Sequence, residues 1–254
     1  MSPPKIEPPV KPTFINVITE LRHFTLITYS VEPQALAAHL PDGFEPEVFT
    51  LKDGRQCSFV SAAVFHDFGF HPAFLSWPTF DFEQTNYRAY VLRGGQRCVW
   101  FFGTTLHTPF VLVPICLWRL PWHYADMKIS TSWQDGVCKF YHYVATGKWG
   151  NAEVEMEGTN EPSGALEGFL DEDETTLVLT HPLLGYYRRT DGQIGTYGIW
   201  HDKLAMNRCV VRKAKFEVFE KLNLITPDAL PHSALIQHST EFVIYLPPST
   251  LQPS

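Results

Sequence analysis

The chain has 254 residues, of which 44% are hydrophobic and 14% aromatic, and its formal net charge is −7. A chain of this length and apolar content buries a sizeable core, so it needs neither disulfides nor a structural metal to fold. Its lysines and arginines are scattered along a net acidic sequence, which excludes the clustered basic surface that nucleic acids require, so we expect no nucleic-acid partner.

The N-terminal stretch MSPPKIEPPVKP is rich in proline and lacks the apolar segment of a secretory signal. We expect residues 1–12 to be a disordered tail, residues 13–246 to be one domain and residues 247–254 to be a C-terminal tail. The longest apolar run, residues 110–118, contains Pro114. It is too short for a bilayer, which needs about 20 residues, so no membrane partner is expected.

Alternation of apolar and polar residues predicts strands along most of the chain. The expected strands are residues 23–30, 55–66, 84–92, 97–103, 126–133, 136–145, 184–190, 193–200, 207–213 and 236–246. Short helices are expected at residues 33–40, 111–119 and 214–222. Many strands with a few short helices predict a mainly β (α+β) fold, a closed cone or barrel of antiparallel strands.

Two glycine-containing turns predict hairpins. Gly94-Gly95 separates residues 84–92 from 97–103, and glycine takes both positive-φ positions of a type I′ turn without steric cost. Asp191-Gly192 gives the same kind of signal between the strands expected at 184–190 and 193–200. The acidic stretch 153–174, which contains several glycines, is expected to be a solvated surface excursion rather than a domain boundary.

The five cysteines form no C-x-x-C pair or other metal-ligand spacing. Most lie in strand-like runs, where a free thiol acts as a small buried hydrophobe, so we expect a reducing compartment and a cytoplasmic protein. The sequence contains no G-x-S-x-G, P-loop, G-x-G-x-x-G or H-E-x-x-H motif. Neither a cofactor nor a metal is therefore predicted.

Asn86, Arg88 and Tyr90 project to one face of the expected strand 84–92, because successive side chains of a strand alternate. An amide, a guanidinium and a phenol on one face suit an outer surface, which the pattern alone slightly favours. Inside a closed cone the same three groups form a polar patch for a carboxylate or carbonyl, with Arg88 making a bidentate contact.

A second candidate is the segment LWRLPWHYA, residues 117–125, in which Trp122, His123 and Tyr124 follow Pro121. Aromatic side chains with polar groups beside a histidine suit a pocket wall and a core edge equally well.

Six short motifs follow one another along the chain. They are Tyr29-x-Val31-x-Pro33, Leu40-Pro41-x-Gly43-Phe44-Glu45, Asn86-x-Arg88-x-Tyr90-Val91, Val99-Trp100-Phe101-Phe102, Leu120-Pro121-x-His123-x-Ala125-x-Met127 and Ile199-x-His201. In their order and spacing, residues 13–246 resemble the acetoacetate decarboxylase-like superfamily, and within it the uncharacterised YqjF-like branch.

The resemblance implies a β-cone or closed barrel around an internal cavity, and assembly into homo-oligomers. It implies that the face carrying Asn86, Arg88 and Tyr90 belongs to the cavity wall rather than to the outer surface. The substrate-binding residues expected on this basis are Asn86, Tyr90, Trp100, Trp122 and Tyr124.

Acetoacetate decarboxylases carry a lysine pair in the segment that matches residues 120–125. One lysine forms a Schiff base with the keto group, and its neighbour lowers its pKa. Here Trp122 and His123 occupy those positions, and the nearest lysine is Lys128. The resemblance therefore implies chemistry without a Schiff base, and decarboxylase-like activity through a relocated lysine remains an alternative.

We expect a cofactor-independent enzyme that performs acid–base chemistry on a small carbonyl or carboxylate compound, as a lyase, isomerase or cyclase does. His123 is the expected proton carrier, because imidazole titrates near neutral pH, and His201 is the second candidate acid or base. Arg88 is expected to hold the anionic oxygen together with Asn86. The other alternative is a carrier that binds a small molecule without converting it.

Overall fold

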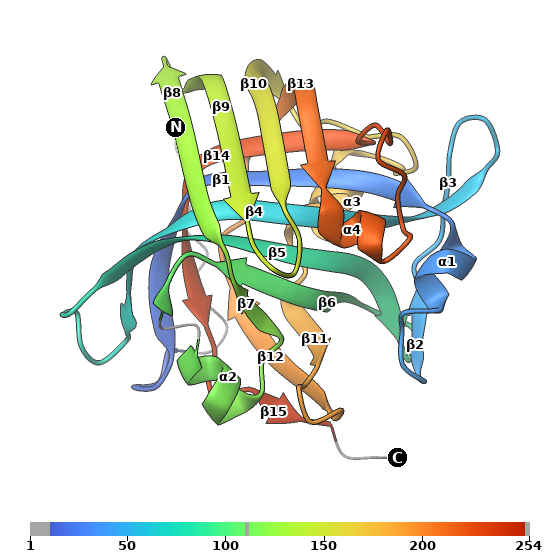
Figure 1. Cartoon of the computed structure of the whole chain (residues 1–254). Helices are drawn as coiled ribbons and strands as arrows, with labels where there is room; N and C mark the ends of the chain where they lie inside the picture. Colours follow the sequence, from blue (N-terminus) through green and yellow to red (C-terminus); the bar gives the residue numbers. More distant parts are fainter. Residues whose placement is uncertain (1–10, 110–111, 252–254) are drawn as a thin grey trace.

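The computed structural model describes residues 11–109 and 112–251. Most of the predicted N-terminal tail, residues 1–10, lies outside the described residues. Strands dominate the fold (Figure 1). They are β1 (Val17–Val31), β2 (Phe44–Pro46), β3 (Phe49–Thr50), β4 (Gln56–Pro72), β5 (Phe80–Arg93), β6 (Gln96–Leu106), β7 (Trp122–Tyr124), β8 (Asp126–Gln134), β9 (Val137–Thr146), β10 (Ala152–Pro162), β11 (Leu184–Arg188), β12 (Ile194–Trp200), β13 (Asn207–Phe216), β14 (Ser233–Ile244) and β15 (Ser249–Thr250).

The helices are short. They are α1 (Pro33–Ala37), α2 (Leu112–Trp118), α3 (Glu172–Thr175), which runs on into a π-helical turn (Thr176–Thr180), and α4 (Glu217–Lys221). Each predicted strand overlaps an observed one, and the three predicted helices overlap α1, α2 and α4. The mainly β prediction is confirmed. No helix in the described part of the chain is both long and apolar enough to cross a membrane.

The prediction for the acidic stretch was wrong in its first half. Residues 152–162 form β10, which pairs with β9 on one side and β13 on the other. The buried residues of this strand alternate with glutamates: Ala152, Val154 and Met156 are buried, and Glu153, Glu155 and Glu157 lie between them. The glutamates lie on the outer face of the sheet, so their charge does not interrupt the strand.

Seven strands join into a ring. β12, β11, β6, β5, β4, β1 and β14 pair in that order, and β14 pairs with β12 to bring the two ends together. Neighbouring strands of this ring are antiparallel except β11 and β6, which are parallel. The predicted closed β-structure is confirmed as a ring-like sheet, which differs from a regular antiparallel barrel.

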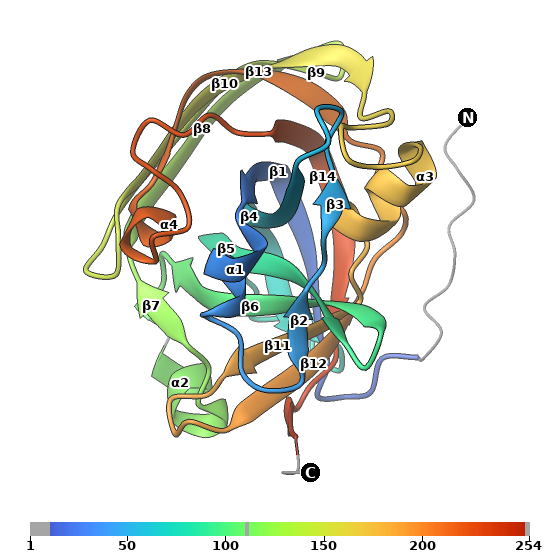
Figure 2. The same ribbon diagram turned by 90° about the vertical axis from the view of Figure 1, so that its right-hand side faces the viewer.

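The strands β13, β10, β9 and β8 continue from β14 and arch over the outer face of the ring (Figure 2). We call these four strands the arch. Tyr141 and Tyr143 of β9 reach down from the arch to Thr25 of β1 and Thr85 of β5, with oxygen–oxygen distances of 3.3 and 2.6 Å. Strands covered on both faces need apolar residues on both, which explains the continuous burial of β4 from Cys57 to Phe65.

Both predicted hairpins are present. Arg93 of β5 pairs with Gln96 of β6, and Gly94 and Gly95 between them have φ values of +57° and +77°. The hairpin of β11 and β12 has a longer turn than Asp191-Gly192 indicates, because Arg188 pairs with Ile194 and leaves residues 189–193 as the loop.

The segment expected as a C-terminal tail takes part in the fold as far as residue 251. Ser249 and Thr250 form β15, which pairs with Thr196 and Gly195 of β12. Residues 252–254 lie outside the described residues.

Candidate functional site

The ring encloses a cavity of about 300 Å³, a volume within the range of small-molecule sites. All seven strands of the ring contribute to its wall. Most of the wall is aromatic or aliphatic, with Phe24, Phe65, Phe101 and Phe242 among its residues. Besides Tyr197, Trp118 and Trp122, the polar residues of the wall are Thr19, Asp67, Gln84, Asn86, Arg88, Thr108, Thr180 and His201.

Arg88 is the cationic group of this wall, and its side chain is buried. Its Nη2 atom donates to the backbone carbonyl of Leu179 at 2.8 Å and to the Tyr90 hydroxyl at 3.4 Å. Its Nε atom is buried without a hydrogen-bond partner, and no Asp or Glu among the described residues forms an ion pair with it. A buried charge without a counter-ion is costly, so the site is suited to an anion.

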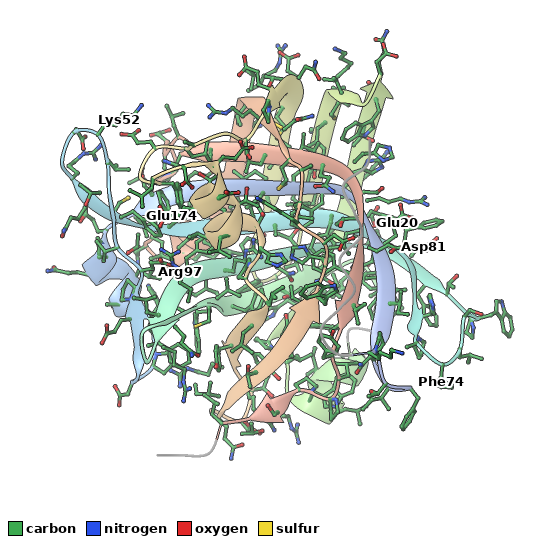
Figure 3. All side chains as sticks on the ribbon, turned by 180° about the vertical axis from the view of Figure 1, so that it is seen from behind. Glu20, Lys52, Phe74, Asp81, Arg97 and Glu174 are labelled. Carbon is green, nitrogen blue, oxygen red and sulfur yellow. The ribbon has the colours of Figure 1, made fainter. Side chains whose placement is uncertain are left out.

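Alternation along β5 places this guanidinium in the cavity. Tyr87, Ala89 and Val91 lie on the other face of the strand, in the core beneath the arch. The Leu179 carbonyl lies in the π-helical turn after α3. Arg97 of β6 pairs with Glu174 of α3 at 3.0 Å, and the two lie side by side in Figure 3. This ion pair ties the turn that holds Arg88 to the ring.

Asn86 offers a hydrogen-bond donor next to Arg88. Its Oδ1 atom accepts from Gln84 Nε2 at 2.9 Å and from Thr104 Oγ1 at 2.8 Å. Both hydrogen bonds are accepted by the carbonyl oxygen of the amide. The Nδ2 group makes no hydrogen bond within the described residues, so it can donate to a ligand.

Tyr90 lies behind Arg88 and is not itself part of the cavity wall. Its hydroxyl donates to the same Leu179 carbonyl at 3.1 Å and lies 2.9 Å from Ser61 Oγ. Tyr90, expected to contact the substrate, instead helps to hold the Arg88 guanidinium in position.

His201 follows β12 and is almost fully buried. Its ring stacks on Phe242 with 4.3 Å between centroids, and its Nδ1 atom donates to the backbone carbonyl of Asp202 at 2.7 Å. Burial lowers the pKa of His201 to about 4, and the charges of His181 and Arg88 act in the same direction. The neutral ring carries its proton on Nδ1, which leaves Nε2 as a proton acceptor.

His201 also lines a second pocket of about 320 Å³. His181, which packs edge-on against His201 with centroids 4.8 Å apart, lines only this second pocket, together with Lys203. His201 thus lines both the ring cavity and the second pocket.

Asp67, a carboxyl group in the cavity wall, was not among the residues predicted for the site. Its side chain is buried, Thr19 Oγ1 donates to its Oδ1 atom at 3.1 Å, and its Oδ2 atom has no hydrogen-bond partner among the described residues. Burial raises the pKa of Asp67 to about 7, against the smaller lowering effects of Thr19 and His66. The predicted strand ended at His66. Extending the alternation of Ala63 and Phe65 by one more step identifies Asp67.

Trp122 lines the cavity as expected of a wall residue, but three other candidates lie elsewhere. The His123 ring stacks on Trp149 at 4.3 Å, and Tyr124 is 52% exposed. β7 has three residues, so His123 lies on the opposite face to Trp122. Trp100 packs against Phe44 in the core beneath the arch. His123, Tyr124 and Trp100 are thus not among the residues that line the cavity with Arg88.

Lys128 is exposed on β8, in the arch. No lysine is among the described residues that line the cavity. Within the described residues, no group of three His, Cys, Asp or Glu side chains is placed to hold a metal ion.

A protein-family model, DUF2071, described as an uncharacterized conserved protein (COG2071), matches residues 19–241. A search of curated proteins gave no match.

Solved structures share the fold. An acetoacetate decarboxylase from Legionella pneumophila has 13% identity and a TM-score of 0.59, covering 99% of this chain and 92% of that one. An acetoacetate decarboxylase-like enzyme from Sphingomonas wittichii RW1 has 9% identity and a TM-score of 0.62, covering 94% of each chain. The enduracididine biosynthesis enzyme MppR, in complex with pyruvate, has 11% identity and a TM-score of 0.59, covering 96% and 92%. The TM-scores show that this chain shares the acetoacetate decarboxylase-like fold. At identities this low, the similarity extends to the fold alone.

Proposed function

The chain belongs to the DUF2071 family of uncharacterized conserved proteins, and we propose that it is an enzyme that binds a small oxo acid in the ring cavity and moves a proton on it. The observation that carries this proposal is the buried Arg88 guanidinium, which faces an apolar cavity and forms no ion pair with the described residues. A carboxylate bound there would supply the missing counter-charge through charge-assisted hydrogen bonds.

The proton acceptor in this proposal is His201. A neutral imidazole at physiological pH takes a proton from the carbon next to a carbonyl, and the C–H electron pair moves to form an enolate. The Nε2 atom of His201 is available for this step, because Nδ1 is engaged with the Asp202 carbonyl. The Asn86 amide would donate to the enolate oxygen, which carries the developing charge.

Return of the proton to a different atom gives an isomerase. Loss of a leaving group from the enolate gives a lyase, and attack of the enolate on a second carbonyl of the same molecule gives a cyclase. The proton-transfer step, which we assign to His201, is common to the three reactions.

The cavity wall favours this route over an imine route. No lysine lines the cavity within the described residues, and Lys128, the candidate for a relocated lysine, is exposed in the arch. Oxo acids also occur among the relatives of the fold, in the name acetoacetate decarboxylase and in the pyruvate complex of MppR.

Deuterium exchange tests the proposal without knowledge of the final product. 2-Oxobutanoate in D2O is followed by proton NMR, and the loss of its C3 proton signal reports proton abstraction. The wild type is expected to accelerate the exchange, and His201→Gln to slow it by about two to four orders of magnitude. Lys128→Ala is the matched control and should exchange as the wild type does.

A carboxylate that binds without exchange would contradict the enzyme and leave a carrier. A borohydride-trapped adduct, detected by intact mass, would contradict the route without an imine and restore a Schiff-base mechanism.

A further inference from the structure

We infer that Asp67 and Thr19 form a second recognition subsite, which holds a further carbonyl oxygen, distant from the carboxylate, of an elongated acid whose carboxylate lies at Arg88. The Arg88 half of this inference rests on the proposed function. The Asp67 half rests on separate observations at the other end of the cavity.

The register of β4 and β5 sets the two groups apart. Arg88 pairs with Ser61, whereas Asp67 pairs with Phe82, six positions along the same pair of strands. At about 3.3 Å per residue, six residues correspond to at most about 20 Å along a strand. Both groups nevertheless line one cavity, which therefore reaches along this length of the strand pair from Arg88 to Asp67.

Between the two ends, the apolar residues Ala63 and Phe65 of β4 and Leu106 of β6 line the wall. Gln84 and Asn86 of β5 line it beside them, hydrogen-bonded to each other. An acid as short as pyruvate would occupy only the Arg88 end of the cavity and would leave most of the apolar residues of the wall without a contact. A hydrocarbon segment between two polar groups fits the wall better.

Asp67 is a buried carboxyl group with defined neighbours rather than a surface carboxylate. It is 2% exposed and its neighbours across the ladders are Leu21 of β1 and Phe82 of β5, both apolar. The imidazole of His66, next to it on β4, lies on the other face of the strand, where it pairs with Glu83 of β5 at 3.7 Å. Among the described residues, no cation forms an ion pair with Asp67.

The hydrogen bonds of Asp67 show which of its oxygen atoms can bind a ligand. Thr19 donates to Oδ1, so a proton on this carboxyl belongs on Oδ2, the atom without a partner. A protonated carboxyl donates one hydrogen bond. Carbonyl oxygens accept such a bond and carry no charge that an apolar site would oppose. The raised pKa of Asp67 agrees with this state.

Matched ligand pairs test the subsite. The probes are 4-oxopentanoate, 6-oxoheptanoate, 8-oxononanoate and 10-oxoundecanoate, each compared with the plain carboxylate of the same chain length. Binding is measured by isothermal titration calorimetry at pH 6. We expect one chain length at which the ketone binds at least tenfold more tightly than its plain partner, because only one length places the carbonyl against Asp67.

Three variants locate that preference. Asp67→Leu should remove the preference for the ketone while leaving the affinity of the plain acids within about threefold. Asp67→Asn keeps a donor and should retain most of the preference. Thr19→Val should reduce it, since the hydroxyl fixes which oxygen of Asp67 carries the proton.

The outcomes separate the two ends of the cavity. Equal binding of ketone and plain acid at all four lengths, or a preference that survives Asp67→Leu, overturns the subsite while the carboxylate site at Arg88 stands. If neither member of any pair binds, the carboxylate site itself is wrong, and the proposed function fails with it.

Discussion

Arg88 and Leu179 are joined by a 2.8 Å hydrogen bond from Nη2 to the backbone carbonyl, so a carbonyl dipole rather than a carboxylate holds the guanidinium of the cavity. A dipole orients the group and leaves its full charge unneutralised. This relationship underlies the account of the site, because an Arg88 already paired with an acid would have no need of an anionic ligand.

Tyr90→Phe is expected to hold the Arg88 guanidinium less firmly, so that carboxylate binding is weakened but not abolished. The change removes hydrogen bonds to Leu179 and Arg88 in a buried position, and each lost bond costs about 1 kcal/mol. Urea unfolding should show a loss of stability of about 1–2 kcal/mol, and carboxylate affinity should fall several-fold. Tyr187→Phe is the control, since the buried Tyr187 hydroxyl has no hydrogen-bond partner among the described residues. An equal effect in both variants would remove Tyr90 from its supporting role.

His201→Gln is expected to change the dependence of stability on pH. The folded pKa of about 4 lies below the unfolded value of about 6.5. The unfolded chain therefore binds a proton between these pH values while the folded protein does not. His201 lowers the free energy of unfolding as the pH falls from about 6.5 to 4, by roughly 3 kcal/mol at most. The variant should lose this part of the slope in unfolding curves, and an unchanged slope would show that the ring is solvated.

Asp67→Asn should have the opposite pH dependence. The folded pKa of about 7 lies above the unfolded value of about 3.9, so the folded protein retains a proton that the unfolded chain releases. The stability that Asp67 provides is complete below about pH 4 and is lost as the pH rises to about 7. The variant should gain stability relative to the wild type as the pH rises from 4 to 8, by about 4 kcal/mol at most. A constant difference between the two proteins would place an ionised carboxylate at this position.

The sequence predicted the face of β5 because β5 is long and alternation holds along it. Asn86 and Arg88 share that face in the structure. The position of His123 was not predictable in the same way, because a strand of three residues has too little pattern to show which neighbour faces inward. The position of His201 in the cavity wall follows from the pairing of β12 with β14. This is a contact between segments far apart in the sequence, which no local pattern reveals.

Gly185→Ala tests the wall of the cavity. A Cβ atom at this position of β11 would lie 2.4 Å from Cε2 of the Phe101 ring, which lines the cavity and stacks on Tyr197. The ring must shift, so we expect weaker ligand binding and some loss of stability. Gly198→Ala, on the paired strand β12, is the control, because its nearest neighbour would be 3.5 Å away, an ordinary contact. Similar ligand affinities in the two variants would show that this part of the wall does not touch the ligand.

Whether Arg88 binds a carboxylate is tested by comparing acids with their neutral amides. Heptanoate and heptanamide, and acetoacetate and acetoacetamide, are titrated into the wild type and Arg88→Gln by calorimetry at neutral pH. We expect the wild type to prefer each acid over its amide by about 10- to 100-fold, the effect of one charge-assisted hydrogen-bonded contact of about 1.5–3 kcal/mol. Arg88→Gln should abolish this preference while the amide affinities stay the same. Equal binding of acid and amide by the wild type, or a preference that Arg88→Gln leaves intact, would contradict a carboxylate site at Arg88.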